Sequence, residues 1–139
     1  MLKSIGNKAF SRVIDANFNR AKEGFRVCED VCRYVLDDAK ATARWKRARH
    51  GLNDAVATFG LRDIVSARDI VGDVGRSTIA AESKRRDVAD IFYANAQRIK
   101  ESLRVLEEFS KLKDVQAAEA LKCLRYEIYD LEKNALKSL

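Results

Sequence analysis

The sequence predicts an all-α fold, a helical bundle of two repeated helical hairpins with one long loop between the halves. Its 139 residues include no proline, the residue that most strongly breaks a helix, and only six glycines. Apolar residues recur at alternating spacings of three and four, as on the buried face of a helix. Hydrophobic residues make up 47% of the chain, which is enough for one core and excludes disorder. We therefore expect a single helical domain over residues 1–139.

The first two helices are predicted over residues 9–36 and 39–59. Ile14 and Phe25 belong to the apolar stripe of the first helix. Gly60 follows the second helix and is typical of a residue that ends one, because glycine adopts left-handed backbone angles without strain.

A long loop is predicted over residues 60–86, where the helical periodicity fails and turn-forming residues gather. A break of this length inside a compact domain favours a lid or a binding loop. Two more helices are predicted, one over residues 87–112 and one that starts after Asp114 and ends near Lys137. Asp114 is a good N-cap because its carboxylate can accept a hydrogen bond from the first turn.

The first and third predicted helices repeat each other at an offset of 78 residues. Between 16–29 and 94–107, eight of 14 residues are identical without a gap. The same offset sets Arg47 on Arg125, so the duplicated unit is predicted to be a whole hairpin. The two hairpins should then pack as a four-helix bundle around a pseudo-twofold axis. The repeated units are about residues 9–59 and 87–137.

The residues that the two halves share are mostly polar. Asn17 and Arg20 in the first half match Asn95 and Arg98 in the second. One interpretation is an ion network between helices, in which Arg20 meets Glu23 or a carboxylate of the facing repeat. The other is that these amides and guanidinium groups converge on one cleft that binds a phosphate or a heterocycle. Both can hold, one in each half.

The cysteines and the single histidine predict no structural metal site. Cys28 and Cys32 stand four apart on one helix face but lack the further ligands that zinc requires, and Cys28 is expected in the core. His50 and Arg49 belong to a basic run that can collect phosphate, so both are candidates for substrate binding. The alternative for His50 is a residue of the surface or of helix packing.

A formal net charge of +6 favours anionic partners, either nucleic acid or phosphorylated substrates. The basic run over residues 40–50 contains Trp45 and suits a nucleic-acid-binding face or an ordinary solvated helix face. No stretch approaches the roughly 20 apolar residues of a membrane span, and the N-terminus lacks the apolar run of a signal peptide. We expect a cytoplasmic protein with reduced thiols and no membrane partner.

The predicted loop carries a weak pattern for phosphoryl transfer. Gly72 and Gly75 allow backbone N–H groups to face an anion. Asp69 and Asp73 offer carboxylates to Mg²⁺, and Arg68 offers a guanidinium to a phosphate. The pattern is not a P-loop, which has a longer spacing between its glycines and a lysine after the second. A plain connector with salt-bridged aspartates is the alternative.

Several blocks stand in a fixed order along the chain. They are Asp15-Ala16-Asn17 with Arg20 and residues 23–29, Arg49-His50, Arg68-Asp69 with residues 72–75, residues 94–109, and Arg125-Tyr126 with residues 129–132. Together they resemble the small helical domain found alone or fused to thiamine-phosphate synthase. The resemblance spans about residues 12 to 132. That family is described as a monofunctional hydroxymethylpyrimidine phosphate kinase, unrelated to the ribokinase-like enzymes that share the reaction.

The resemblance implies transfer of the γ-phosphoryl group of ATP to 4-amino-5-hydroxymethyl-2-methylpyrimidine phosphate, which makes the pyrophosphate used in thiamine biosynthesis. A second hypothesis is a non-catalytic pyrimidine-phosphate-binding or regulatory partner domain of thiamine-phosphate synthase. A third is a basic nucleic-acid-binding module. Because no synthase barrel follows residue 139, we expect a stand-alone version or a truncated piece. A homo-oligomer is compatible with each hypothesis.

We assign site residues for the kinase reaction from these patterns. The phosphate of the pyrimidine is already ionised near neutral pH, so the reaction needs charge neutralisation and alignment rather than a strong base. Catalytic roles on phosphates are assigned to Arg20, Arg98 and Arg68. Substrate binding is assigned to Asn17, Asn95, Glu23, Glu101, His50 and Arg49. Nucleotide binding is assigned to the loop with Gly72 and Gly75, and Mg²⁺ binding to Asp69 and Asp73.

Overall fold

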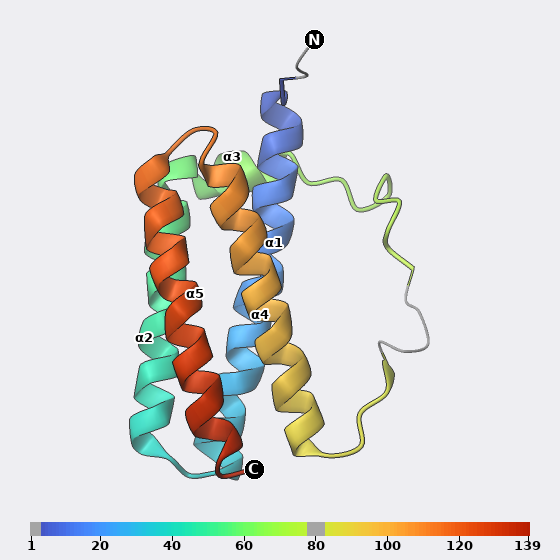
Figure 1. Cartoon of the computed structure of the whole chain (residues 1–139). Helices are drawn as coiled ribbons and strands as arrows, with labels where there is room; N and C mark the ends of the chain where they lie inside the picture. Colours follow the sequence, from blue (N-terminus) through green and yellow to red (C-terminus); the bar gives the residue numbers. More distant parts are fainter. Residues whose placement is uncertain (1–3, 78–82) are drawn as a thin grey trace.

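The computed structural model describes residues 4–77 and 83–139 and confirms the all-α class. Within these residues the chain forms five α-helices and no β-strand (Figure 1). They are α1 (Asn7–Asp30), α2 (Ala39–Val56), α3 (Leu61–Ser66), α4 (Val88–Ser110) and α5 (Val115–Leu136). Part of the predicted loop, residues 78–82, lies outside the described residues.

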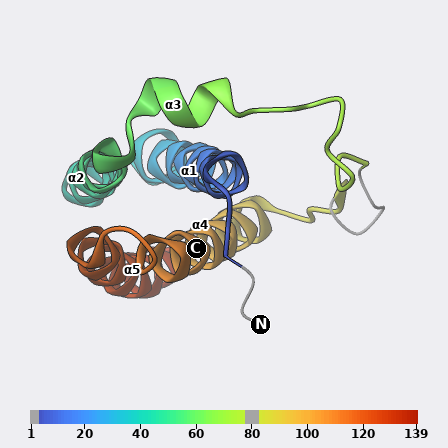
Figure 2. The ribbon, with the colours of Figure 1, turned by 90° about the horizontal axis from the view of Figure 1, so that it is seen from above.

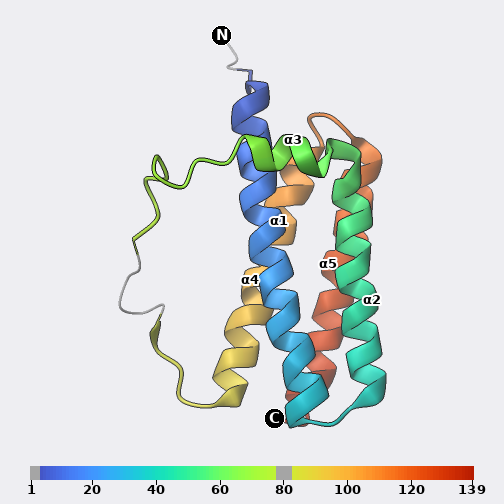
Figure 3. The same cartoon turned by 180° about the vertical axis from the view of Figure 1, so that it is seen from behind.

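The four long helices form two layers, one of α1 and α2 and the other of α4 and α5 (Figure 2). Helices α1 and α5 run toward one end of the bundle, while α2 and α4 run back, so neighbours in the bundle are antiparallel (Figure 1). The short helix α3 crosses α1 on the outer side of the first layer (Figure 3). The loop after α3 leaves the bundle beside α1, so residues of the loop and of α1 line a common pocket.

Aspartates begin three of the long helices. The side chains of Asp38, Asp87 and Asp114 each accept a hydrogen bond from a backbone N–H three residues later. Each cap satisfies a donor that a helix N-terminus would otherwise leave unpaired. Gly60 ends the second helical segment with a φ of 75°. The predicted N-cap at Asp114 and the predicted C-terminal glycine are therefore confirmed.

Two elements differ from the sequence prediction. The first helix does not stay regular to residue 36, because α1 continues as a π-helical turn over Val31–Val35. Helix α3 lies inside the segment predicted as loop, so that part of the prediction is wrong. It has only six residues, and Ile64 is its one buried residue. A helix this short carries too few apolar positions to show a period.

The core surrounds Trp45, which is fully buried. Its ring meets Phe25 and Phe92 edge to face, with ring centroids 6.2 and 5.6 Å apart. Such pairs contribute about 0.5–1.5 kcal/mol each beyond their buried area. Cys28 and Cys32 are buried in the same core. Burial raises the pKa of the Cys28 thiol far above its usual range and that of Cys32 to about 11. The prediction of Cys28 as a core residue is confirmed.

Each of the two hairpins, α1 with α2 and α4 with α5, is joined by a buried ion pair. Arg49 Nε donates to Glu29 at 2.9 Å, and Arg125 Nη2 donates to Glu107 at 3.0 Å. The offset of 78 residues aligned Arg47 with Arg125. Arg47 is exposed, however, and the residue that pairs with a buried glutamate as Arg125 does is Arg49. The paired residues are separated by 20 residues in the first hairpin and by 18 in the second. The two hairpins therefore cannot be aligned along their whole length without a gap.

Candidate functional site

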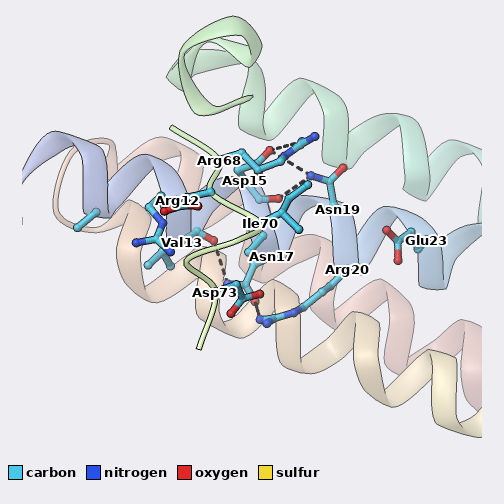
Figure 4. A pocket seen from close by; sticks show the side chains of 13 residues that line it. Arg12, Val13, Asp15, Asn17, Asn19, Arg20, Glu23, Arg68, Ile70 and Asp73 are labelled. Carbon is cyan, nitrogen blue, oxygen red and sulfur yellow. Dashed lines mark hydrogen bonds and ion pairs between the residues drawn. The ribbon is translucent and has the colours of Figure 1, made fainter. Parts of the chain in front are cut away.

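A pocket of about 680 Å³ lies between α1 and the loop that follows α3 (Figure 4). The two segments are far apart in the sequence. Helix α3 crosses the outer side of α1, and the loop leaves from the end of α3 beside α1 (Figure 3). The pocket brings together six of the residues that the sequence assigned to the site. They are Asn17, Arg20, Glu23, Arg68, Asp69 and Asp73.

The floor of the pocket is a stripe of exposed residues on α1, three of them charged. Arg12, Ala16, Arg20 and Glu23 line it and stand three or four residues apart, so they share one face of the helix. The opposite face of α1 carries the apolar stripe that packs into the bundle core. A rigid core helix therefore presents these side chains, which favours precise placement of a ligand.

Arg68 and Asp15 tie the loop to this helix. Arg68 Nε and Nη2 donate to the two carboxylate oxygens of Asp15 at 2.7 and 2.8 Å, and Asn19 donates to the same carboxylate at 3.1 Å. The Asp15 side chain is buried, whereas Arg68 is partly exposed. The hydrogen bonds from Arg68 to Asp15 raise the pKa of the guanidinium above its ordinary value. Arg68 was assigned to a phosphate from the sequence, but two of its N–H groups already donate to the Asp15 carboxylate.

Asn17 and Arg20 form a polar pair beside this ion pair. The buried Asn17 amide donates to the Val13 carbonyl at 2.9 Å, and Arg20 Nη1 approaches the Asn17 Oδ1 at 3.4 Å. Within residues 4–77 and 83–139, Arg20 forms no ion pair with Glu23 or with any other carboxylate. The guanidinium of Arg20 remains available for an external anion.

The loop glycines do not face the pocket as the sequence pattern suggested. The Gly72 N–H donates to Asp69 Oδ1 at 2.8 Å, and the Gly75 N–H donates to Asp73 Oδ1 at 3.0 Å. Both N–H groups are thus used inside the loop. The aspartates themselves line the pocket, and the second oxygen of each carboxylate makes no hydrogen bond to the described part of the chain.

The matched residues of the second half do not line this pocket. Gly24 packs against Ile99 and the Asn95 carbonyl. Because α1 and α4 are antiparallel, Asn17 lies about 10 Å along the helix axis from that level. The Asn95 amide donates to the Ile91 carbonyl, as the Asn17 amide does to the Val13 carbonyl, and Arg98 is exposed on α4. The shared asparagines and arginines therefore do not converge on one cleft.

The remaining assigned residues also lie elsewhere. Glu101 lines a separate groove between α4 and α5, together with Lys100 and Arg125. Arg49 is buried in its ion pair with Glu29, and His50 is exposed on α2. None of these residues lines the pocket on α1.

Two of the charged residues that line the pocket, Arg12 and Asp15, had no role assigned from the sequence. Arg12 lines it but was given no role, although its spacing to Arg20 of two helical turns places both on one flank. Asp15 was noted as part of a block of residues, yet its partner Arg68 is 53 residues away. A contact across that distance leaves no periodic signal in the sequence.

The charges around the pocket are mixed. Three arginines and four carboxylates line it. Once Asp15 and Arg68 neutralise each other, Arg12 and Arg20 face the remaining three acidic side chains. Such a lining suits an anion that arrives with a cation, such as a magnesium-bound phosphate, better than a bare polyanion. One or two carboxylates are also what Mg²⁺ commonly takes from a protein when phosphates supply further ligands, and Asp69 and Asp73 each offer one oxygen.

Two general features can be stated for the described part of the chain. No group of three or more His, Cys, Asp or Glu side chains stands close enough there to hold a metal ion. None of its helices combines the length and apolar character needed to cross a membrane.

Comparison with known proteins identifies relatives of this chain. The model of the ThiD2 family matches residues 12–134. The chain is 41% identical over 131 residues to a thiamine-phosphate synthase of Synechocystis sp., covering 94% of this chain and 37% of the relative. It is 40% identical over 126 residues to the synthase of Nostoc punctiforme (90% and 35% covered) and 37% identical over 119 residues to that of Rhodopirellula baltica (85% and 32% covered). The chain thus spans about a third of the length of these curated relatives. No solved structure matches it.

Proposed function

The chain belongs to the ThiD2 family, and on that premise we propose that it binds hydroxymethylpyrimidine phosphate in thiamine biosynthesis, as a partner domain of thiamine-phosphate synthase. Its similarity to about a third of proteins named thiamine-phosphate synthase supports that association. The observation that carries the binding proposal is the Arg20 guanidinium, which pairs with no carboxylate of the described residues and lies beside Asn17 in the pocket on α1.

The pocket offers each group that such a ligand needs. The Arg20 guanidinium can donate two hydrogen bonds to the phosphate, and the adjacent Asn17 can orient it. Val13 and Ile70 line the same pocket and provide apolar surface for the ring. Glu23 offers a hydrogen-bond acceptor for an amino group of the pyrimidine.

Phosphorylation of the bound pyrimidine phosphate by ATP is a second candidate function, favoured by the two aspartates in the same pocket. Asp69 and Asp73 would hold Mg²⁺, which would neutralise charge on the nucleotide phosphates. An ionised oxygen of the pyrimidine phosphate would attack the γ-phosphorus. The bond from that phosphorus to the β-phosphate oxygen would break, and ADP would leave with the electron pair. Arg20 would align the attacking phosphate and needs no proton transfer.

One assay tests both functions. The purified chain is mixed with the pyrimidine monophosphate, with and without Mg-ATP, while thermal stability, ADP and the diphosphate product are measured. Stabilisation by the pyrimidine phosphate supports binding, because a ligand that binds only the folded state raises its stability. Release of ADP with equal diphosphate product supports the kinase. Stabilisation without ADP release favours the partner domain alone.

The absence of stabilisation and of product would overturn both functions. Salt-sensitive binding to RNA or DNA without any response to the pyrimidine would then favour the nucleic-acid module. Location in the cytoplasm stays a prediction that fractionation of intact cells tests, and self-association stays one that sedimentation of the purified chain tests.

A further inference from the structure

Two free guanidinium groups belong to the pocket, and they come from different turns of α1. Arg12 and Arg20 both line it. Eight residues separate them, which corresponds to about 12 Å along the helix axis. Neither side chain forms an ion pair with a carboxylate among residues 4–77 and 83–139.

The loop after α3 passes between these two arginines. In Figure 4, Arg12 lies on one side of the loop segment that carries Ile70, and Arg20 lies on the other side beside Asp73. The ion pair of Asp15 and Arg68 fixes the loop in that position. The same pocket therefore has one free cation on each side of this loop segment.

Comparison of the two halves supports a special role for Arg12. With the offset of 78 residues, Arg12 aligns with Asp90 and Asp15 aligns with Tyr93. Asp90 accepts hydrogen bonds from Arg86, so the matching position carries a neutralised acid instead of a free cation. The second half has neither the extra arginine nor the carboxylate that holds the loop. Arg12 is thus not a by-product of the packing that both halves share.

We propose that Arg12 forms a second anion subsite, which takes the phosphate chain of a nucleoside triphosphate while Arg20 and Asn17 hold the phosphate of the pyrimidine. The proposal rests on the proposed function and deepens it. A domain that only binds one pyrimidine phosphate needs one cation, whereas phosphoryl transfer needs two anionic reactants held side by side. Arg12 supplies the second cation, in the same pocket as Arg20.

Calorimetric titration of two ligands into matched variants tests this subsite. The ligands are the pyrimidine monophosphate and a magnesium-bound ATP analogue that cannot be hydrolysed. Arg12→Ala should weaken binding of the nucleotide about tenfold, the effect of one lost charge-assisted hydrogen bond, and leave the pyrimidine phosphate within about twofold. Arg20→Ala should show the reverse preference. Both residues are exposed, so the fold should tolerate either change.

Lys8→Ala is the control, because Lys8 is an exposed cation on the same helix that does not line the pocket. It should leave both affinities unchanged. Equal nucleotide affinity in Arg12→Ala and the unmodified protein would overturn the second subsite, as would an unmodified protein that binds the pyrimidine phosphate but no nucleotide. The proposed pyrimidine binding is judged separately, by the titration with the pyrimidine monophosphate. Nucleotide binding that depends on Arg12, without pyrimidine binding, would support the subsite and refute the proposed function.

Discussion

Arg68 and Asp15 lie 53 residues apart in the sequence and are joined by two hydrogen bonds of 2.7 and 2.8 Å. The carboxylate is buried on α1, whereas the loop that begins at Arg68 is exposed. Among the described residues, no other ion pair ties residues 67–77 to the bundle. This contact therefore decides where Asp69 and Asp73 stand relative to α1.

Asp15→Asn should release the loop. The change removes the negative charge and places an amide N–H₂ group near the guanidinium, so Arg68 loses its partner. Trypsin should then cleave after Arg68 and Arg76 faster than in the unmodified protein, and affinity for the pyrimidine phosphate should fall at least about tenfold because the pocket wall is displaced. Glu127→Gln is the control, since it weakens an ion pair of α2 and α5 away from the pocket. Cleavage at the unmodified rate in Asp15→Asn would contradict this role of the pair.

Arg20→Ala should impair the site with the fold retained. If the chain is the proposed kinase, kcat/KM should fall at least about tenfold, which corresponds to roughly 1.4 kcal/mol of transition-state stabilisation. If it only binds the pyrimidine phosphate, the Kd should rise by a similar factor. Steady-state kinetics and titration measure these values. Arg98→Ala is the matched control, because Arg98 is the counterpart in the repeat but lies outside the pocket. Full activity of a folded Arg20→Ala protein would refute the assignment.

The local chemistry of the sequence predicted the helices well. Asp114 and Gly60 mark their boundaries through one side-chain cap and one positive φ, and both depend on residues within a single turn. Helix α3 escaped prediction because its stability comes from one buried side chain, Ile64, and from its contact with α1. Its six residues alone contain no sign of that contact.

The candidate site was predictable only in part, because the residues that the two halves of the chain share are not the same as the residues that line the pocket. The repeat drew attention to Asn17 and Arg20, which do line the pocket, but equally to Asn95 and Arg98, which do not. What distinguishes the first half is a position the repeat does not share, Arg12, together with a loop that covers only α1. Such an asymmetry depends on the path of the loop in space, which residue spacing does not encode.

Arg49→Ala should affect stability and leave the pocket intact. Removal of the guanidinium leaves the buried Glu29 carboxylate without its partner on α2, a change that typically costs about 3–5 kcal/mol. Urea denaturation should show the loss, while affinity for the pyrimidine phosphate at a temperature where the protein is folded should be unchanged. His50→Ala, the exposed neighbouring position, should alter stability by less than about 0.5 kcal/mol. Weaker ligand binding in folded Arg49→Ala would restore Arg49 to the site.

Gly24→Ala should weaken the bundle at a close contact between α1 and α4. A Cβ atom at Gly24 would lie 2.8 Å from Ile99 Cγ1 and 3.0 Å from the Asn95 carbonyl oxygen, so the side chain and the backbone of α4 would both have to move. Overpacking of this kind costs about 1–3 kcal/mol, which exceeds the gain of about 0.5–1 kcal/mol from replacing a helical glycine by alanine. Gly51→Ala is the matched control, because its Cβ would meet only Leu124 Cδ1 at an ordinary 3.8 Å. Thermal or urea unfolding should therefore move in opposite directions for the two variants, and a stabilised Gly24→Ala protein would show that the helices can separate at this point without loss.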